Sequence, residues 1–268
     1  MEQGKASRSY AALVAAGILL SRVAGLVRDR VFAHYLGNSD AADAFRAAFR
    51  IPNILQNLFG EGVLSASFIP VYANLLAQGK REEADRVASA IFCLLALVMS
   101  GLVLVGVLAT PWLIDAIAPG FAGAKRDLTI RLVRILFPGA ALLALSAWCL
   151  GILNSHRRFF ISYTAPVIWN AAIIAALIGW GGRLEQFPLT EVAAWGSVAG
   201  SALQFGVQLP SVIRAMRGFR IWLGGRSGEV RTVVRNFVPS FVSRGVVQVS
   251  AYIDTMIASL LSTGALAG

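Results

Sequence analysis

Charged side chains stand inside segments of this chain that are otherwise suited to a lipid bilayer. The first two apolar stretches hold five arginines and three acids: Arg22, Arg28, Arg30, Arg46, Arg50, Asp29, Asp43 and Glu61. A charge at the bilayer centre costs roughly 2.5–3.5 kcal/mol on insertion scales, so such residues face a protein interior or a wet cavity. Because the arginines outnumber the acids, guanidinium groups remain for an anion. The planar guanidinium fork binds phosphate and stays charged, which predicts a phosphate-bearing ligand.

The polar residues of the second stretch follow one line. At 100° per residue, six of them fall within about 80° of one another on a straight helix: Asp43, Arg46, Arg50, Asn53, Asn57 and Glu61. We predict that the ligand is bound by Arg22, Arg28, Arg46, Arg50, Asn53 and Asn57, and that Asp29, Asp43 and Glu61 form ion pairs or a gate. The alternative is that the charges only pair with one another, for example Asp43 with Arg46, and hold helices together.

The arginines of the first stretch do not share one face. Arg22, Gly25 and Asp29 share a face by their i, i+3, i+7 spacing, so Arg28 points elsewhere if the helix is straight. Gly17 and Gly25 permit a local bend, and the two arginines would converge only at such a break.

Composition defines the elements that must position these residues. The chain has 268 residues, of which 57% are hydrophobic and 14% charged, whereas soluble domains carry about 25% charged residues. We therefore expect an all-α integral membrane protein with seven spans, near 10–37, 41–78, 87–118, 128–154, 160–181, 192–213 and 237–262. The second span is too long for one straight helix and contains Pro52 and Pro70, so we expect a kink there.

The basic residues between the spans predict the orientation. With the N-terminus inside the cell, the cytoplasmic segments hold thirteen Lys and Arg residues and the opposite side holds three, namely Lys125, Arg126 and Arg183. This bias favours a cytoplasmic N-terminus. The net charge of +10 is not gathered on a soluble module with interleaved aromatic residues, so we expect no nucleic-acid partner.

The remaining chemical candidates are weaker. Cys93 and Cys149 lie within apolar spans without metal-ligand spacing, and no nucleotide-binding motif occurs, so we expect no metal, no cofactor and no catalytic residue. We expect His156 to be a solvated turn residue and Asp85 to lie in a solvated loop. Arg244 and Asp254 are ten residues apart and cannot pair along one helix, so each needs a partner from another helix, an ion or a substrate.

Several motifs resemble a known family. The segments SRVAGLVRD (21–29), ADAF (42–45) and IPNILQNLFGEGVLSASFIPVYA (51–73) closely resemble the MurJ/MviN lipid II flippases. These belong to the multidrug/oligosaccharidyl-lipid/polysaccharide exporter superfamily. APGF (118–121) and GILNSHRRF (151–159) fit the same family, so the resemblance runs through essentially the whole chain.

The resemblance implies a bacterial inner-membrane transporter with two lobes of six helices. Such a protein moves lipid II, the undecaprenyl-pyrophosphate-linked peptidoglycan precursor, from the cytoplasmic to the periplasmic leaflet by alternating access. The implied partners are lipid II and membrane lipids, and the complete protein is expected to be a monomer. Residues matching Arg22, Arg28, Asp43 and Glu61 would lie in the central cavity and its gate. Relatives also carry a basic residue where this chain has Gln56 or Asn57, so that part of the charge pattern differs.

The resemblance also predicts a domain organisation. Residues 1–213 would form the N-terminal lobe of six helices, 214–236 a basic cytoplasmic linker, and 237–268 the truncated seventh helix that starts the second lobe. A further cavity arginine of the eighth helix would lie beyond Gly268. We therefore expect an incomplete protein that does not transport alone. By analogy with sodium-coupled relatives, Asp254 is a candidate cation-site residue, with the membrane potential, H⁺ or Na⁺ as possible energy sources.

Two other functions compete with this interpretation. One is a membrane enzyme acting on a lipid phosphate, but that class usually needs paired acids for Mg²⁺ at the cytoplasmic face or a nucleophilic histidine. The other is a related exporter of a different polyprenyl-linked polysaccharide or of drugs.

Overall fold

The computed structural model describes residues 2–216, 218–219 and 228–259, and it leaves out the side chains of 2–13, 51, 61 and 246–259. Within this part of the chain, all regular structure is helical. The helices are α1 (Glu2–Leu36), α2 (Asp40–Phe59), α3 (Glu61–Ser67), α4 (Ile69–Ala77), α5 (Arg81–Ile117), α6 (Gly123–Ser155), α7 (Phe159–Trp180), α8 (Gln186–Ala215) and α9 (Gly228–Ser259). The predicted all-α fold is confirmed.

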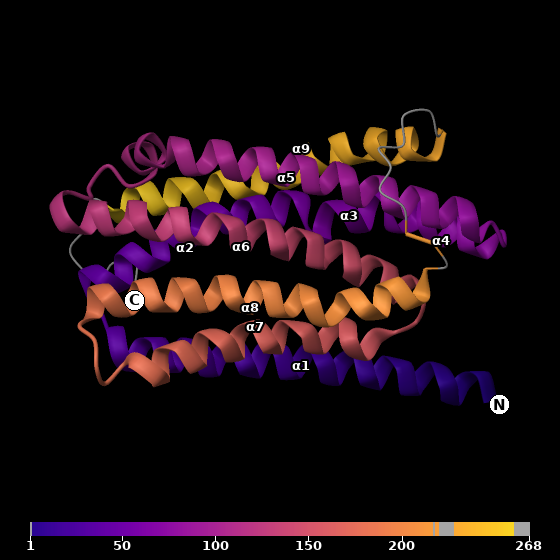
Figure 1. Cartoon of the computed structure of the whole chain (residues 1–268), viewed down its shortest axis with the longest axis horizontal. Helices are drawn as coiled ribbons and strands as arrows, with labels where there is room; N and C mark the ends of the chain where they lie inside the picture. Colours follow the sequence, from indigo (N-terminus) through magenta and orange to yellow (C-terminus); the bar gives the residue numbers. More distant parts are fainter. Residues whose placement is uncertain (1, 217, 220–227, 260–268) are drawn as a thin grey trace.

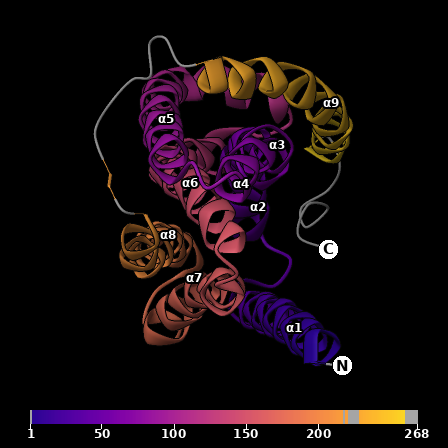
Figure 2. The ribbon, with the colours of Figure 1, turned by 90° about the vertical axis from the view of Figure 1, so that its right-hand side faces the viewer.

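The long helices lie side by side and run the length of the molecule (Figure 1). Helix α6 is central and packs against α2, α5 and α8, while α7 joins α8 to α1. Viewed along the bundle, α1 and α9 lie at two edges of one face, with α2, α3 and α4 between them and set back (Figure 2). The bundle thus has an N-terminal end, which carries the start of α1, and an opposite end with the α1–α2 turn.

Two apolar cores hold these helices together. Near the α1–α2 turn, Phe137 of α6 and Leu177 of α7 are fully buried in the first core. The second core surrounds Trp148 of α6, whose indole Nε1 donates a hydrogen bond of 3.1 Å to the Ala88 carbonyl of α5. A buried Trp usually needs such a partner for its N–H. Helix α6 contributes buried side chains to both cores and so connects the two ends of the bundle.

The predicted second span is divided into three helices, and the break is not at proline. Pro52 lies inside α2 without ending it, whereas Gly60 has φ −91° and ψ −140°, far from helical values. A Cβ atom at Gly60 would collide with the carbonyl oxygen of Gln56, which explains the glycine. Pro70 lies in the first turn of α4, where its missing N–H costs no helical hydrogen bond. The expected kink therefore exists, but its cause is a glycine.

Helix α1 differs from the expectation in the opposite way. It continues without interruption from Glu2 to Leu36, so Gly17 and Gly25 do not break it. Gly17 instead lets α7 approach closely, because an added Cβ would lie 2.6 Å from Cβ of Tyr163. The two arginines of α1 consequently keep the separate directions that a straight helix gives them.

Four helical stretches of the described residues are long and apolar enough to cross a membrane on their own composition. They are Asp40–Ala77, which covers α2 to α4, and α5, α6 and α7. Helix α5 also exposes large apolar side chains: Leu97, Leu104, Leu108 and Trp112 are 62–73% exposed. A continuous apolar face of this size is expected on a surface that lipid covers.

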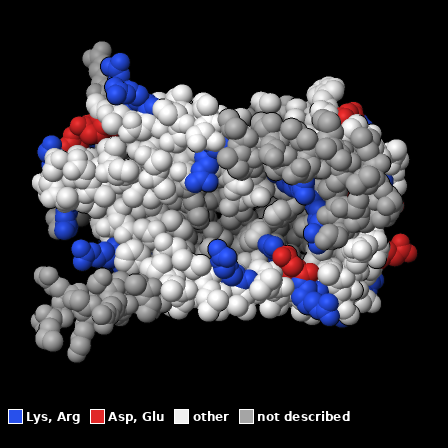
Figure 3. Space-filling model, turned by 180° about the vertical axis from the view of Figure 1, so that it is seen from behind, with Lys and Arg blue, Asp and Glu red and all other residues white. Residues whose placement is uncertain are grey.

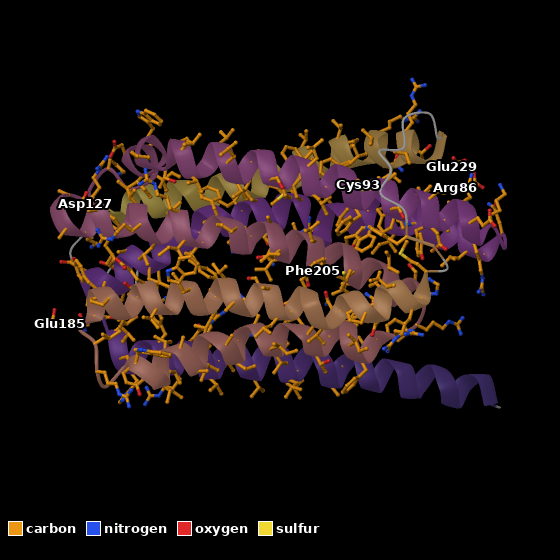
Figure 4. All side chains as sticks on the ribbon, in the orientation of Figure 1. Arg86, Cys93, Asp127, Glu185, Phe205 and Glu229 are labelled. Atoms are coloured by element: carbon orange, nitrogen blue, oxygen red, sulfur yellow. The ribbon has the colours of Figure 1, made fainter. Side chains whose placement is uncertain are left out.

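Charged residues mark the two ends of the bundle. Arg86 and Glu229 lie at the N-terminal end and Asp127 and Glu185 at the opposite end, with Phe205 between them (Figure 4). Helix α8 extends to Ala215 and α9 begins at Gly228, so the helices reach into the segment expected to be a linker. The division of the chain into lobes and linker remains a prediction.

Candidate functional site

A cavity of about 320 Å³ opens between α1, α2 and α7. Its lining residues are Arg28, Asp29, Phe32, Phe45, Arg46, Phe49, Arg50 and Ile173. It belongs to the face between α1 and α9, which is hollowed and carries basic and acidic side chains around the hollow (Figure 3). Three arginines and one aspartate give the lining a formal charge of +2. The cavity is therefore suited to an anion.

The α1–α2 turn brings these charges together. Gly37 has φ +54°, a left-handed conformation that glycine adopts without strain, and Ser39 caps α2 by accepting a hydrogen bond from the Ala42 N–H. Arg28 precedes the end of α1 by eight residues and Arg46 follows the start of α2 by six. At 1.5 Å per residue both lie about 9–12 Å from the turn, so the two guanidinium groups reach the same level.

Two of the three guanidinium groups of the cavity, those of Arg28 and Arg46, are held by neighbouring side chains. Arg28 donates from Nε and Nη2 to Oδ1 of Asp29, at 3.1 and 2.8 Å. Its Cζ lies 5.2 Å from the ring centroid of Trp169 on α7. Cζ of Arg46 lies 5.7 Å from the ring centroid of Phe32. These cation–π contacts orient the guanidinium planes and leave donors for a ligand.

Aromatic rings form the apolar part of the cavity wall. The ring centroids of Phe32 and Phe45 are 5.0 Å apart, those of Phe45 and Phe49 5.8 Å, and those of Phe49 and Trp169 5.8 Å. An apolar wall lowers the local dielectric constant, which strengthens the attraction between a guanidinium and an anion. A volume of 320 Å³ lies at the lower end of ligand-pocket volumes, which suits the phosphate groups of a lipid headgroup rather than a whole lipid.

A second charged cluster lies at the same end of the bundle. Nζ of Lys125 on α6 lies 2.8 Å from Oδ2 of Asp43 and 3.0 Å from Oδ1 of Asp40, and 4.4 Å from the ring centroid of Phe121. The Asp43 side chain is 2% exposed. Asp43 thus forms an ion pair with Lys125 of α6, and its role as a gate remains a prediction. The α1–α2 turn is thereby tied to the α5–α6 turn.

The structure brings together only part of the predicted set. Arg28, Asp29, Arg46 and Arg50 line the cavity. Arg22 and Asn57 lie on exposed surface, and Asn53 faces a smaller space of about 20 Å³ between α2, α6 and α8. The polar line is interrupted at Gly60, so Glu61 begins a separate helix. The side chains of Glu61 and Asp254 lie outside the described part, and the ligand roles of all these residues remain predictions.

Two residues of the site, Trp169 and Lys125, are not identified by sequence reasoning. Trp169 comes from α7, about 140 residues after Arg28, and helical periodicity contains no signal for a contact across that separation. In the sequence, Lys125 bears only on the orientation of the chain in the membrane, as one of three basic residues on the non-cytoplasmic side. The acidic pair Asp40 and Asp43 in the first turn of α2 did indicate a cationic partner, although not which one.

Two expectations of solvated residues were wrong. His156 is half-buried, and its Nε2 lies 2.9 Å from the hydroxyl of Tyr72, a hydrogen-bonding distance. Burial, the largest influence, lowers the pKa of His156, and the charges of Arg158 and Arg81 act in the same direction, against the carboxylate of Asp85. Asp85 itself is buried in α5 rather than placed in a loop. The turn between α6 and α7 is thus anchored on α4.

Comparison with known proteins agrees with this architecture. Residues 32–268 match the family model described as "Lipid II flippase MurJ". The lipid II flippase MurJ of Burkholderia cenocepacia is 34% identical over 253 residues, which cover 92% of this chain and 49% of that protein. A solved structure of lipid II flippase MurJ in an inward closed conformation is similar with a TM-score of 0.76 at 26% identity, over 94% of this chain and 51% of that one.

An outward-facing multidrug resistance MATE transporter is similar with a TM-score of 0.69 at 16% identity, over 91% of this chain and 54% of that one, which indicates a common fold alone. The chain spans about half the length of the curated relatives it matches. The resemblance seen in the motifs of α1 and α2 is confirmed, because the family model matches most of the chain. The chain is a multi-pass membrane protein that belongs to the lipid II flippase MurJ family.

Proposed function

We propose that this chain takes part in moving lipid II between the leaflets of the bacterial inner membrane, for peptidoglycan synthesis. The single observation that supports this most strongly is the cavity with Arg28, Arg46 and Arg50 in its lining. The cargo has a pyrophosphate between its lipid tail and its sugar-peptide headgroup. Guanidinium groups in an aromatic-walled cavity would bind that pyrophosphate while the tail remains in the membrane.

The charged ends of the bundle suggest the direction of transport. In this proposal the N-terminal end, which holds the excess of basic residues, lies in the cytoplasm. The cavity then lies in the periplasmic half of the membrane, about 9–12 Å from the α1–α2 turn. The Lys125 cluster would keep that side closed until the cargo has entered from the cytoplasm.

The chemistry proposed here is binding and movement without bond breaking. The cavity contains one carboxylate beside three guanidinium groups, whereas a metal-dependent lipid phosphatase needs several acidic ligands for its metal. We therefore propose a transporter without a cofactor, which acts as a monomer and draws its energy from the membrane potential, H⁺ or Na⁺. A cation site at Asp254 is part of this proposal.

The test is a leaflet assay in living cells. A chimera would carry these 268 residues in place of the matching half of the Burkholderia cenocepacia flippase, in cells depleted of their own flippase. Lipid II would then be probed from the periplasm with a membrane-impermeant enzyme that cleaves it. We expect restored access and growth. A chimera that reaches the membrane but leaves lipid II inaccessible would contradict the proposal, and accessibility of a different polyprenyl-linked sugar would favour the alternative cargo.

A further inference from the structure

Arg244 of α9 lies directly against the helix that follows the break at Gly60. A Cβ atom added to Gly62 of α3 would lie 2.6 Å from Cζ and 2.9 Å from Nη2 of Arg244. The guanidinium therefore rests on the α3 backbone at a place where only glycine leaves room for it. The contact with α3 fixes the position of the Arg244 side chain, for which helical periodicity identifies no partner on its own helix.

Three phenylalanines dock α9 at this point. The ring centroid of Phe59 lies 5.7 Å from that of Phe237 and 5.3 Å from that of Phe241, which are themselves 5.9 Å apart. Arg244 follows Phe241 by three residues, so both side chains leave α9 on the same side. The aromatic cluster thus directs the guanidinium toward α3 and the hollowed face.

The position of Arg244 favours a bound anion. It lies sixteen residues after the start of α9 and fifteen before its end, or roughly 22–24 Å from each. Its side chain is exposed, and among the described side chains no carboxylate forms a salt bridge with it. Helix α9 is less apolar than the four candidate spans but runs along the bundle beside them (Figure 1). A guanidinium midway along such a helix persists beside water or an anion.

The arginine cavity lies on the same face of the bundle as Arg244. Arg50 and Arg46 precede the end of α2 at Phe59 by nine and thirteen residues, or about 14–20 Å of helix. Gly62 follows that end, so Arg244 lies nearer the N-terminal end of the bundle than those arginines. Helices α1 and α9 border the same face (Figure 2), and basic side chains surround its hollow (Figure 3). Guanidinium groups therefore stand at two levels along this face.

We infer that Arg244 is a second phosphate-binding residue, which holds the pyrophosphate of the polyprenyl-linked cargo at an inner subsite before it reaches the cavity lined by Arg28, Arg46 and Arg50. This inference rests on the proposed function and adds a stage to it. The inner subsite provides a bidentate donor for the cargo at a level nearer the N-terminal end of the bundle than the arginine cavity. Gly62 is its positioning residue, because it sets how close the guanidinium lies to α3.

Binding to the purified chimera tests the inner subsite. The probe is a short-chain polyprenyl pyrophosphate, with the polyprenyl alcohol of the same length as the control ligand. Arg244→Gln should weaken pyrophosphate binding about 10- to 100-fold, the range for a lost charged hydrogen bond, and change alcohol binding less than about twofold. Arg235→Gln removes another exposed charge of α9 and should leave both affinities unchanged.

Gly62→Ala provides a second variant that keeps the charge. The added methyl group displaces the guanidinium, so binding should weaken in the wild-type background and change no further in Arg244→Gln. Arg244→Lys should retain part of the affinity, because a point charge replaces the fork.

Unchanged pyrophosphate affinity in Arg244→Gln would overturn the inference, as would an equal loss of alcohol binding, which would mean that Arg244 only holds α9. An equal loss in Glu61→Gln would also overturn it, because Arg244 would then act as an ion-pair partner of that acid. In each case Arg28→Ala would still weaken binding, and the proposed function would stand. Absence of pyrophosphate binding by the unmutated chimera, or full binding by Arg28→Ala, would instead contradict the proposed function.

Discussion

The ion pairs of Lys125 predict an asymmetric response to mutation. The side chains of Asp43 and Lys125 are 2% and 17% exposed, whereas that of Asp40 is 49% exposed. Removing one partner of a buried pair costs about 3–5 kcal/mol because it leaves a buried charge behind. The N-terminus of α2 stabilises Asp43 by about 0.3–1 kcal/mol and offsets part of that loss. We therefore expect Lys125→Met to destabilise the protein by about 2–4 kcal/mol.

The exposed partner should behave differently. Asp40→Asn removes a solvent-screened contact, for which measured values are about 0–1 kcal/mol. Thermal unfolding in detergent would compare both variants with the unmutated protein. At about 2–4 °C per kcal/mol for a chain of this size, Lys125→Met should lower Tm by roughly 4–16 °C and Asp40→Asn by no more than about 4 °C. Equal effects of the two variants, or an unchanged Tm for Lys125→Met, would refute this account of the cluster.

Three other predictions concern the turn between α6 and α7, the cavity wall and the contact of α7 with α8. Burial lowers the pKa of His156 in the fold, so the unfolded chain takes up a proton more readily as pH falls through about 6.5. Tm should therefore fall there, and His156→Asn should flatten that pH profile. Trp169→Ala should weaken pyrophosphate binding several-fold, since the Arg28 contact contributes about 0.5–2 kcal/mol, whereas Trp169→Phe, assayed in the same way, should retain most of it. Gly200→Ala places a Cβ 2.9 Å from the Trp169 carbonyl oxygen and should cost about 1–3 kcal/mol in a thermal unfolding assay, while Gly206→Ala on the same helix meets nothing within 4 Å and should be neutral or stabilising.

The helical membrane fold, and the gathering of arginines from the first two apolar stretches around one cavity, were predictable from the sequence, while anion binding there remains a prediction. Charges inside apolar stretches carry a large energetic cost, which distinguishes Arg22, Arg28, Arg30, Arg46 and Arg50 in the sequence, and three of these five line the cavity. Helical periodicity also placed Arg46 and Arg50 on one side of α2, and the cavity between α1, α2 and α7 uses that side.

Other features depend on contacts that periodicity does not encode. Lys125 meets Asp43 across 82 residues, and Trp169 reaches Arg28 from a helix with no polar pattern. The break at Gly60 arises from a backbone conformation that a Cβ would forbid, while the more conspicuous Pro52 is tolerated inside α2. Five of the six polar residues of the second span lie within α2, whereas Glu61 begins a separate helix after Gly60, which a straight-helix expectation does not provide for.

The role of Arg28 in moving the cargo is the central claim, and periplasmic access to lipid II measures it most directly. In flippase-depleted cells, the chimera with Arg28→Ala should reach the membrane but leave lipid II inaccessible from the periplasm. Arg30→Ala, which removes an exposed arginine two residues away, should restore access as the unmutated chimera does. Full access to lipid II with Arg28→Ala would contradict the claim that the guanidinium of Arg28 binds the translocated anion.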